Sequence, residues 1–257
     1  MLSRAEFLIE LARRRIMERH VGSSVVLLWA LVAPLIPLLI NLAVFYFIAQ
    51  IPQIRSMGVL EYTVFIFSGL LPFRIIQSAA SEASELMVSN MDMLKSVNFP
   101  LHSMSLASII AQMMDFGVQL GLLLVLLLLN GTGVGLHILM LPLAVLLLVS
   151  FLAGMSWTIS VVGYLFRELR EIVILLFSAL LYLSPVMYPA DAAPPLMKKL
   201  FLFNPITHFV TIFRDVLFSN GVFHWESWAI ASIMSAFVFG IGYFAISRTK
   251  RFVGDMI

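Results

Sequence analysis

The chain of 257 residues is 61% hydrophobic, has only 12% charged residues and carries a formal net charge of +2. Soluble globular domains contain about 25% charged residues, so this composition excludes an ordinary soluble domain. It predicts one all-α integral membrane domain over residues 1–257. The small net charge gives no reason to expect a nucleic-acid partner. A chain without cysteine cannot form disulfides, thiolate nucleophiles or cysteine-ligated metal sites.

Residues 1–20 are rich in charge but follow a helical pattern. The apolar residues that would share one helical face are Leu2, Ala5, Leu8, Ile9, Ala12 and Ile16. Most of the arginines fall on other faces, namely Arg4, Arg13, Arg14, Arg15 and Arg19. This pattern predicts an N-terminal amphipathic helix in the membrane interface, with its basic side toward lipid phosphates.

Long apolar segments follow. A hydrocarbon core about 30 Å thick is crossed by roughly 20 helical residues. The uncharged stretch 116–166 is far longer, and the Asn- and Gly-rich residues 130–135 favour a turn that divides it into two crossings. The sequence therefore predicts six transmembrane helices. The first lies within 21–54, and the others lie at about 62–81, 101–129, 136–165, 172–187 and 227–247.

Between the last two predicted spans, residues 190–225 contain two apolar segments that are too short to cross a bilayer, 196–203 and 206–218. Asn204 and Pro205 separate them. Irregular backbone at membrane depth needs protein or a water-filled cavity around it. We therefore expect two short re-entrant helices before the last span.

Basic residues indicate the orientation, because cytoplasmic loops carry an excess of Lys and Arg. One side of the six-span topology collects the N-terminal arginines, Lys95, Arg167, Arg170 and the basic tail, and the other holds Arg55, Lys198, Lys199 and Arg214. The larger group predicts that both termini are cytoplasmic.

Two charged residues, Arg74 and Asp115, fall inside predicted spans. A charge at the centre of a bilayer costs roughly 2.5–3.5 kcal/mol on insertion scales, so each should face a partner or water. An ion pair between them near mid-membrane is one interpretation. A second is that Arg74 lines a pathway for an anionic substrate, and a third is that the span boundaries differ from those predicted.

Aromatic residues near the outer end of the first span offer a second channel hypothesis. Phe45, Tyr46 and Phe47 could present their rings to sugar rings inside a pore. Packing in the core or against lipid is the alternative for these residues.

Residues 82–100 form a mixed polar and apolar segment on the cytoplasmic side, closed by Pro100. A short helix there would present Met91, Leu94 and Val97 to another protein, and an ordinary loop is the alternative.

The sequence contains no catalytic pattern. The histidines show neither metal-ligand spacing nor a nucleophile partner, and they are His20, His102, His137, His208 and His224. The phosphate-binding loop Gly-x-x-x-x-Gly-Lys-Ser/Thr is also missing from the sequence. We therefore expect no enzyme activity, no metal site and no cofactor in this chain.

Several motifs occur in order along nearly the whole sequence. They are GS at 22–23 with LWA at 28–30 and Pro34, SGLLPF at 68–73, the segment 90–100, FRELR at 166–170, LSPVMYP at 183–189, FNP at 203–205 and FRDVL at 213–217. Together they resemble the membrane (permease) subunits of ABC-2 type exporters for O-antigen, capsular polysaccharide or teichoic acid. Arg74 is a departure, since the family more often has an aromatic or aliphatic residue there, and it would suit an acidic glycan.

The resemblance implies a homodimer in the bacterial cytoplasmic (inner) membrane, with a channel for polysaccharide or glycolipid between the two copies. It implies two separate ATP-binding cassette ATPase subunits, which hold ATP and Mg, and it allows periplasmic and outer-membrane export proteins as further partners. The implied ATPase-coupling residues are Asn90, Met91, Leu94, Lys95, Val97, Phe99 and Pro100, and the implied periplasmic gate residues are Asn204, Pro205 and Arg214. An exporter of a drug or small lipid with the same six-span plan is the main alternative. A membrane-bound glycolipid enzyme or a structural subunit is another.

Overall fold

The structure is a computed structural model that describes residues 9–15, 26–49, 51–90, 101–131, 135–166, 168–218 and 223–255. Within these ranges every regular element is helical. The elements are α2 (Val26–Leu42, continued by a π-helical segment Ala43–Ile48), α3 (Pro52–Arg55), α4 (Val59–Ser89), α6 (Leu101–Leu129), a short 3-10 segment Leu136–Met140, α7 (Leu141–Leu165), α8 (Leu169–Tyr182), a 3-10 turn Ala190–Ala192, α9 (Pro195–Phe203), α10 (Pro205–Leu217) and α11 (Trp225–Asp255).

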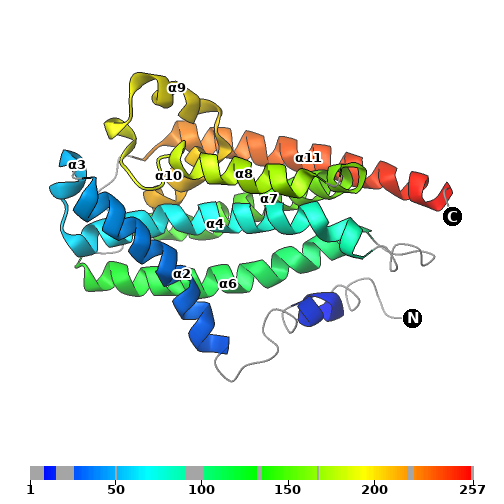
Figure 1. Ribbon diagram of the computed structural model, residues 1–257, viewed down its shortest axis with the longest axis horizontal. Coiled ribbons are helices and arrows are strands. Elements are labelled where there is room, and N and C mark those ends of the chain that lie inside the picture. Colours follow the sequence, from blue (N-terminus) through cyan, green and yellow to red (C-terminus); the bar gives the residue numbers. More distant parts are fainter. Residues whose placement is uncertain are drawn as a thin grey trace.

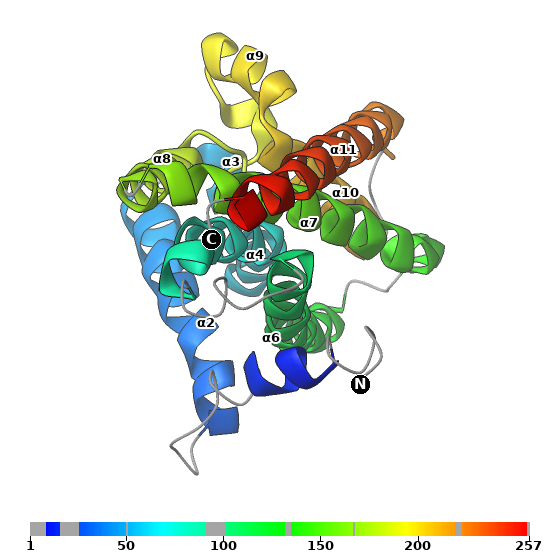
Figure 2. The ribbon, with the colours of Figure 1, turned by 90° about the vertical axis from the view of Figure 1, so that its right-hand side faces the viewer.

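The helix α4 is the central element of the bundle. It packs against α2, α6, α7, α8 and α10. Figure 1 shows α4, α6, α7, α8 and α11 running along the long axis of the molecule, with α2 crossing them obliquely. In the end view of Figure 2, α4 lies in the middle of the other helices and α9 stands away from them. A movement of α4 therefore acts on most of the bundle.

Side chains from α4 and α10 make up much of the buried core. The largest side chains that are almost fully buried include Tyr62, Phe67 and Phe73 of α4 and Phe209 and Phe213 of α10. Phe213 meets Phe116 of α6, and Phe209 meets Phe151 of α7, with ring centroids 5.7 and 5.0 Å apart. Helix α10 is therefore held between α4, α6 and α7 at one end of the bundle.

Two long helices, α7 and α11, approach each other through glycine. A Cβ atom added to Gly154 would collide with the backbone of Val238, and one added to Gly242 would collide with the backbone of Gly154. Small residues let helix backbones come close in membranes, where packing replaces the hydrophobic effect as the source of association.

Within the described residues, four helical stretches are long and apolar enough to cross a membrane: Val59–Met87, His102–Leu129, Leu136–Leu165 and Trp225–Arg248. The pair α9–α10 would make a fifth if it counts as one span, but it bends by 89° at Asn204. Helix α8 has 14 residues, which at 1.5 Å per residue is about 21 Å and short of a core about 30 Å thick. The chain is therefore an all-helical membrane protein with four to five candidate spans.

Several predicted boundaries differ from the observed ones. The segments 101–129 and 136–165 coincide with helical stretches. In contrast, α4 continues to Ser89, so the first part of the predicted cytoplasmic segment 82–100 extends the helix. Helix α8 ends at Tyr182, because Pro185 has no N–H to continue the helix and disfavours helical backbone at Ser184.

The predicted interface helix over residues 1–20 is described in part. Residues 9–15 are helical. Ala12 is buried, whereas Ile9, which shares the predicted apolar face, is 64% exposed. The remainder of that prediction lies outside the described residues.

Candidate functional site

The corner between α9 and α10 is formed by Asn204 and Pro205. The Asn204 Oδ1 accepts a hydrogen bond from the Ile206 backbone N–H at 3.0 Å, and its Nδ2 donates to the Ser184 hydroxyl at 2.8 Å. Pro205 occupies the first helical position, where its missing N–H costs no hydrogen bond. The predicted break is confirmed, and the side chain of Asn204 also attaches it to the segment that follows α8.

Arg214, predicted as part of a gate, is partly buried and bound to neutral groups. It donates to the backbone carbonyl oxygens of Pro185, Val186 and Phe65 at 2.7, 2.9 and 3.3 Å. It also donates to the Ser68 hydroxyl at 3.3 Å, and its guanidinium lies 3.8 Å from the centre of the Phe65 ring. These contacts join α10 to α4 and to residues 183–189, and we call them the Arg214 cluster.

The packing around the Arg214 cluster is too tight for a larger residue at Gly69 of α4. A Cβ atom there would lie 2.7 Å from the Val186 carbonyl oxygen and 2.9 Å from Nη2 of Arg214. About two helical turns toward the N-terminal end of α4, the Tyr62 hydroxyl donates to the Met187 carbonyl at 2.7 Å. Residues 183–189 therefore contact α4 at two positions along its length, near Gly69 and at Tyr62.

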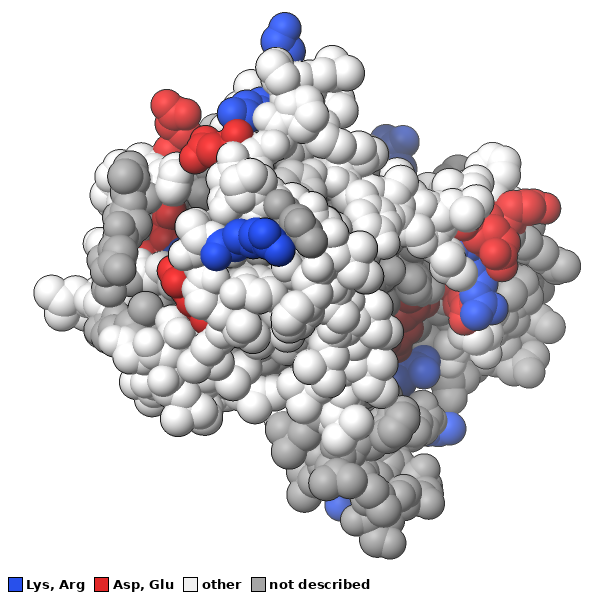
Figure 3. All heavy atoms as spheres, turned by 60° about the vertical axis from the view of Figure 1, so that its left-hand side comes forward, with Lys and Arg blue, Asp and Glu red and all other residues white. Residues whose placement is uncertain are grey.

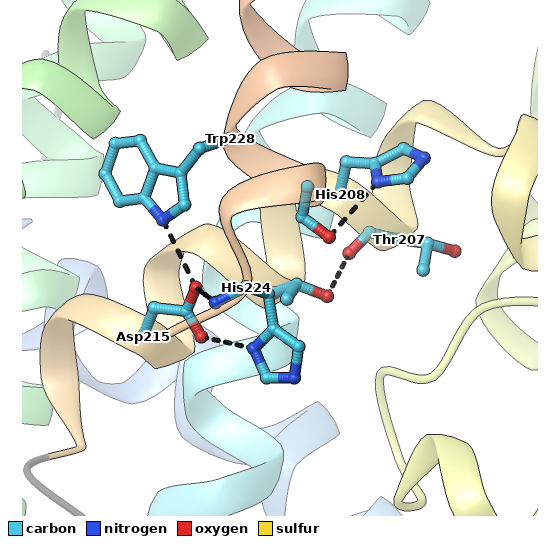
Figure 4. A network of polar contacts seen from close by, with 7 residues as sticks. Thr207, His208, Asp215, His224 and Trp228 are labelled. Carbon is cyan, nitrogen blue, oxygen red and sulfur yellow. Dashed lines mark hydrogen bonds and ion pairs between the residues drawn. The ribbon is translucent and has the colours of Figure 1, made fainter. Parts of the chain in front are cut away.

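Asp215, the next residue, belongs to a separate network that faces α11 (Figure 4). The carboxylate accepts hydrogen bonds from the His224 backbone N–H at 3.0 Å and from the Trp228 indole N–H at 3.2 Å. It also lies 2.7 Å from Nδ1 of His224, which carries a hydrogen in the tautomer that donates to it. A buried carboxylate needs such donors, so Asp215 ties the end of α10 to the start of α11.

His208 makes a second link in the same region, which Figure 4 also shows. Its Nε2 lies 3.0 Å from the Leu202 carbonyl oxygen, and its Nδ1 lies 3.4 Å from the Ser227 hydroxyl. His208 of α10 thereby contacts both α9, through Leu202, and α11, through Ser227.

Arg74 is exposed, although its neighbours Phe73 and Ile75 in α4 are buried. The residues that follow it at helical spacing on this face are all polar and are exposed or half-buried: Ser78, Ser81, Glu82 and Glu85. We call Arg74 and these four residues the polar stripe of α4. A helix inside a membrane protein exposes such a stripe to water, a partner or a polar ligand.

Neighbouring helices flank the C-terminal half of the polar stripe. Gln112 of α6 donates to Glu82 at 2.9 Å, and Arg170 of α8 forms an ion pair with Glu85 at 2.5 Å. Most of the face in Figure 3 is uncharged, and charged side chains gather around the end that carries α3 and α9 and near the opposite margin. Within α4, Arg74 is the charged residue that lies between Glu61 and Glu82.

The structure does not pair Arg74 with Asp115. The ion pairs found between described residues join Arg170 to Glu85 and His224 to Asp215. The contact between Gln112 and Glu82 sets the register of the two helices. By helical rise, Arg74 lies about 12 Å along α4 from Glu82, whereas Asp115 lies only about 4.5 Å along α6 from Gln112, in the same direction. The two charged residues therefore stand at different levels of the bundle.

The predicted aromatic channel residues do not share one role. Tyr46 donates its hydroxyl to the Met57 carbonyl at 3.2 Å, and its ring lies 5.7 Å from that of Tyr62. Phe45 is partly buried against the core. Phe47 is 61% exposed, so it is the member of this group whose ring is available to a ligand.

Of the predicted coupling residues, the structure describes Asn90. Its side chain donates to the Leu86 carbonyl at 2.8 Å, which closes the end of α4, and Nη2 of Arg15 lies 3.5 Å from its Oδ1. The other predicted coupling residues lie outside the described residues: Met91, Leu94, Lys95, Val97, Phe99 and Pro100.

Several residues that organise this region were not predicted from the sequence. They are Tyr62, Gly69, and His224 and Trp228, which both contact Asp215. The signal in the sequence was an Asp and an Arg inside the otherwise apolar segment 206–218. Over the part of the chain that the structure describes, no group of three or more metal-ligating side chains occurs.

Comparison with known proteins identifies relatives along nearly the whole chain. Residues 7–218 match the sequence model of the family described as ABC-2 type transporter. An O-antigen export system permease protein RfbA from Klebsiella pneumoniae is 24% identical over 246 residues, covering 95% of this chain and 92% of that protein. The protein of the same name from Myxococcus xanthus is 24% identical over 218 residues, with 83% and 80% covered. The polysialic acid transport protein KpsM from Escherichia coli is 24% identical over 228 residues, with 87% and 85% covered.

Proposed function

The chain belongs to the ABC-2 type transporter family, and we propose on that premise that it is the permease subunit of an ATP-driven polysaccharide exporter. The observation that carries the proposal is the near full-length similarity to permeases named for O-antigen and polysialic acid transport. The substrate would be a polysaccharide, in many cases linked to a lipid, that passes from the cytoplasm to the periplasm or cell surface.

In the proposed topology the chain crosses the bacterial cytoplasmic membrane six times, with both termini in the cytoplasm. Helices α4, α6, α7 and α11 are the long crossings, and α2 and α8, each with the segment that follows it, make the other two. The bent pair α9–α10 would enter the outer leaflet and return. Its short helices and 89° bend support this assignment, and the N-terminal helix would lie in the cytoplasmic interface.

ATP hydrolysis would take place on two separate ATPase subunits, which dock on segment 82–100. The sequence has no phosphate-binding loop of its own, and this supports a separate ATPase. The docking residues would follow directly on the end of α4 at Ser89. A push on them would act on a rigid central helix, and packed helices shift between arrangements instead of stretching.

Two copies of the chain would enclose the channel, with the polar stripe of α4 and Phe47 available to line it. Arg74 supports this, because an exposed guanidinium at membrane depth needs water, a partner or an anion beside it. The polysaccharide would move in short strokes through a continuous channel, since a long polymer does not fit one closed cavity. Periplasmic and outer-membrane proteins would receive it in bacteria that have them.

The experiment that tests the function is co-purification with the cognate ATPase subunit, followed by an ATPase assay in lipid and an assay of surface polysaccharide. In the wild type we expect a stable complex and export that depends on this chain. In the Leu94→Asp variant we expect loss of the complex and of export, because a charge would replace an apolar contact at the docking surface.

A matched control introduces the same charge two residues away, in Ser96→Asp. This variant should keep the complex if Leu94 is the contact. Loss of the complex in both variants would indicate a general effect of charge in the segment, and retention in both would move the ATPase contact elsewhere. Normal surface polysaccharide in cells that lack the chain would instead favour an exporter of a drug or small lipid.

A further inference from the structure

The central helix α4 connects the two ends of the molecule that a transport cycle has to coordinate. Its cytoplasmic end, at Ser89 and Asn90, directly precedes the segment on which the ATPase is proposed to dock. Its outer half carries Tyr62, Phe65 and Ser68, which contact the loop after α8 and the bent pair. The question is which contact passes a movement of α4 to the outer helices.

The Arg214 cluster is the best candidate, because one side chain binds three segments at once. Its donors reach Phe65 and Ser68 on α4 and Pro185 and Val186 on the loop, while its backbone belongs to α10. A partly buried guanidinium keeps all of these hydrogen bonds only if the acceptors move with it. The loop, α10 and the outer half of α4 should therefore behave as one body.

The close packing at Gly69 strengthens this connection. The space between α4, the Val186 carbonyl and the guanidinium does not hold even one added methyl group without displacement. A planar guanidinium with five donors fits several acceptors around it at fixed angles, whereas a lysine ammonium is a compact charge on a flexible stem. The site thus fits an arginine at position 214 and a glycine at position 69.

The other side of the bent pair is much less constrained. Helix α9 exposes Leu196, Leu200, Leu202 and Phe203, and among the described elements it packs mainly against α10. Asp215 attaches α10 to α11 in another direction. Helix α9 therefore takes its position from α10, and α10 takes its position from α4 and α11.

We propose that Arg214 is the positioning residue that couples α4 to the bent pair α9–α10, so that a movement started at the cytoplasmic end of α4 displaces the outer pair. The inference rests on the proposed function. It predicts a variant in which the ATPase still moves α4 but the outer pair no longer follows, and in which ATP is hydrolysed without export.

The chain has no cysteine, so single cysteines can carry spin labels without background. Labels at Ser89→Cys on α4 and at Leu200→Cys on α9 would each report a distance between the two copies of the complex with the ATPase in lipid nanodiscs. In the wild type we expect trapping with ATP and vanadate to shift both distances. In Arg214→Gln we expect the shift at position 89 to remain, the shift at position 200 to be lost, and export to be lost while ATPase activity continues.

Two further variants keep the test decisive. Gly69→Ala leaves Arg214 in place but crowds its guanidinium, so this variant should reduce the shift at position 200. Arg214→Lys keeps the charge and should restore only part of the shift that Arg214→Gln loses. Arg248→Gln makes the same substitution at an exposed arginine of α11 that stacks on Phe244, so it is the matched control and should leave the shift at position 200 in place. A full shift at position 200 in both Arg214→Gln and Gly69→Ala would overturn the inference.

The design separates this inference from the proposed function. No complex with the ATPase, or no shift at position 89 in the wild type, would contradict the proposed function itself. A shift at position 89 with no shift at position 200 in the wild type would contradict the inference alone.

Discussion

Arg214 and Asp215 are adjacent and oppositely charged, yet they bind different surroundings. Successive residues on a helix point in different directions, so Arg214 reaches α4 and Asp215 reaches α11. Each charge is stabilised by hydrogen bonds, since Arg214 donates to backbone carbonyl oxygens and Asp215 accepts from the His224 backbone N–H and the Trp228 indole. The sequence shows that two charges occur in an apolar segment, but their partners come from residues far away along the chain.

The hydroxyl of Tyr62 offers a test at the same scale. In Tyr62→Phe the buried Met187 carbonyl loses its donor, and an unsatisfied buried group costs about 1–3 kcal/mol. We expect a lower temperature of unfolding in detergent, measured by the loss of monodisperse protein on heating. Tyr243→Phe is the matched control, because Tyr243 is 55% exposed and its ring contact with Trp157 survives the change. Equal effects in both variants would contradict the structural role of the Tyr62 hydroxyl.

Arg74 carries a prediction about the substrate. If it attracts an anionic glycan or a lipid phosphate, Arg74→Gln should lower export while leaving the complex with the ATPase intact, because the exposed side chain supports no described core contact. The measurement is the amount of surface polysaccharide at equal protein levels. Arg55→Gln, which removes an exposed arginine from the short helix α3, is the control. Unchanged export in Arg74→Gln would exclude a role for this charge in the pathway.

At the scale of the elements, glycine decides how closely the long helices pack. Gly163 of α7 faces α4, and a Cβ atom there would lie 2.5 Å from the Ser84 carbonyl oxygen. Forcing extra volume into such an interface costs typically about 1–3 kcal/mol. We expect Gly163→Ala to lower thermal stability and the yield of folded protein.

The control for this prediction is Gly117→Ala in α6, where an added Cβ meets nothing within 4 Å. Alanine favours a helix over glycine by up to about 1 kcal/mol, so this variant should be neutral or slightly more stable. The two substitutions are chemically identical and differ only in their surroundings. Destabilisation by Gly117→Ala of the same size would show that the contact between α4 and α7 is not the cause.

The elements themselves were predictable to different degrees. Residues 101–129 and 136–165 were predicted at their observed ends, because Pro100, the turn near Gly131 and the charged residues after Phe166 bound two long apolar runs. The end of α4 was not predicted, since the polar residues Glu82 and Glu85 favour a loop in the sequence. In the structure Gln112 and Arg170 stabilise them on the helix. Tertiary partners thus extended a helix beyond its apolar part.

For the whole molecule, the central prediction is the sidedness of its loops. In a chain without cysteine, a membrane-impermeant thiol reagent should reach Ser56→Cys and Asp191→Cys from the outer side and Glu171→Cys from the cytoplasmic side. This outcome follows if α8 crosses the membrane together with residues 183–189. Labelling of Asp191→Cys and Glu171→Cys from the same side would show that α8 does not cross, and the topology would then have fewer than six spans.

The sequence alone determined that this is a helical membrane protein of the ABC-2 type, because long uncharged runs have no other stable environment and because its motifs occur in family order. It also located the break at Asn204 and Pro205, since local capping chemistry creates it. Only the tertiary structure decided that Arg74 and Asp115 stand apart, that Arg214 joins α4 to the bent pair, and that Asp215 binds α11. Those outcomes depend on helix register and on which faces meet, and neither is encoded in any short stretch of sequence.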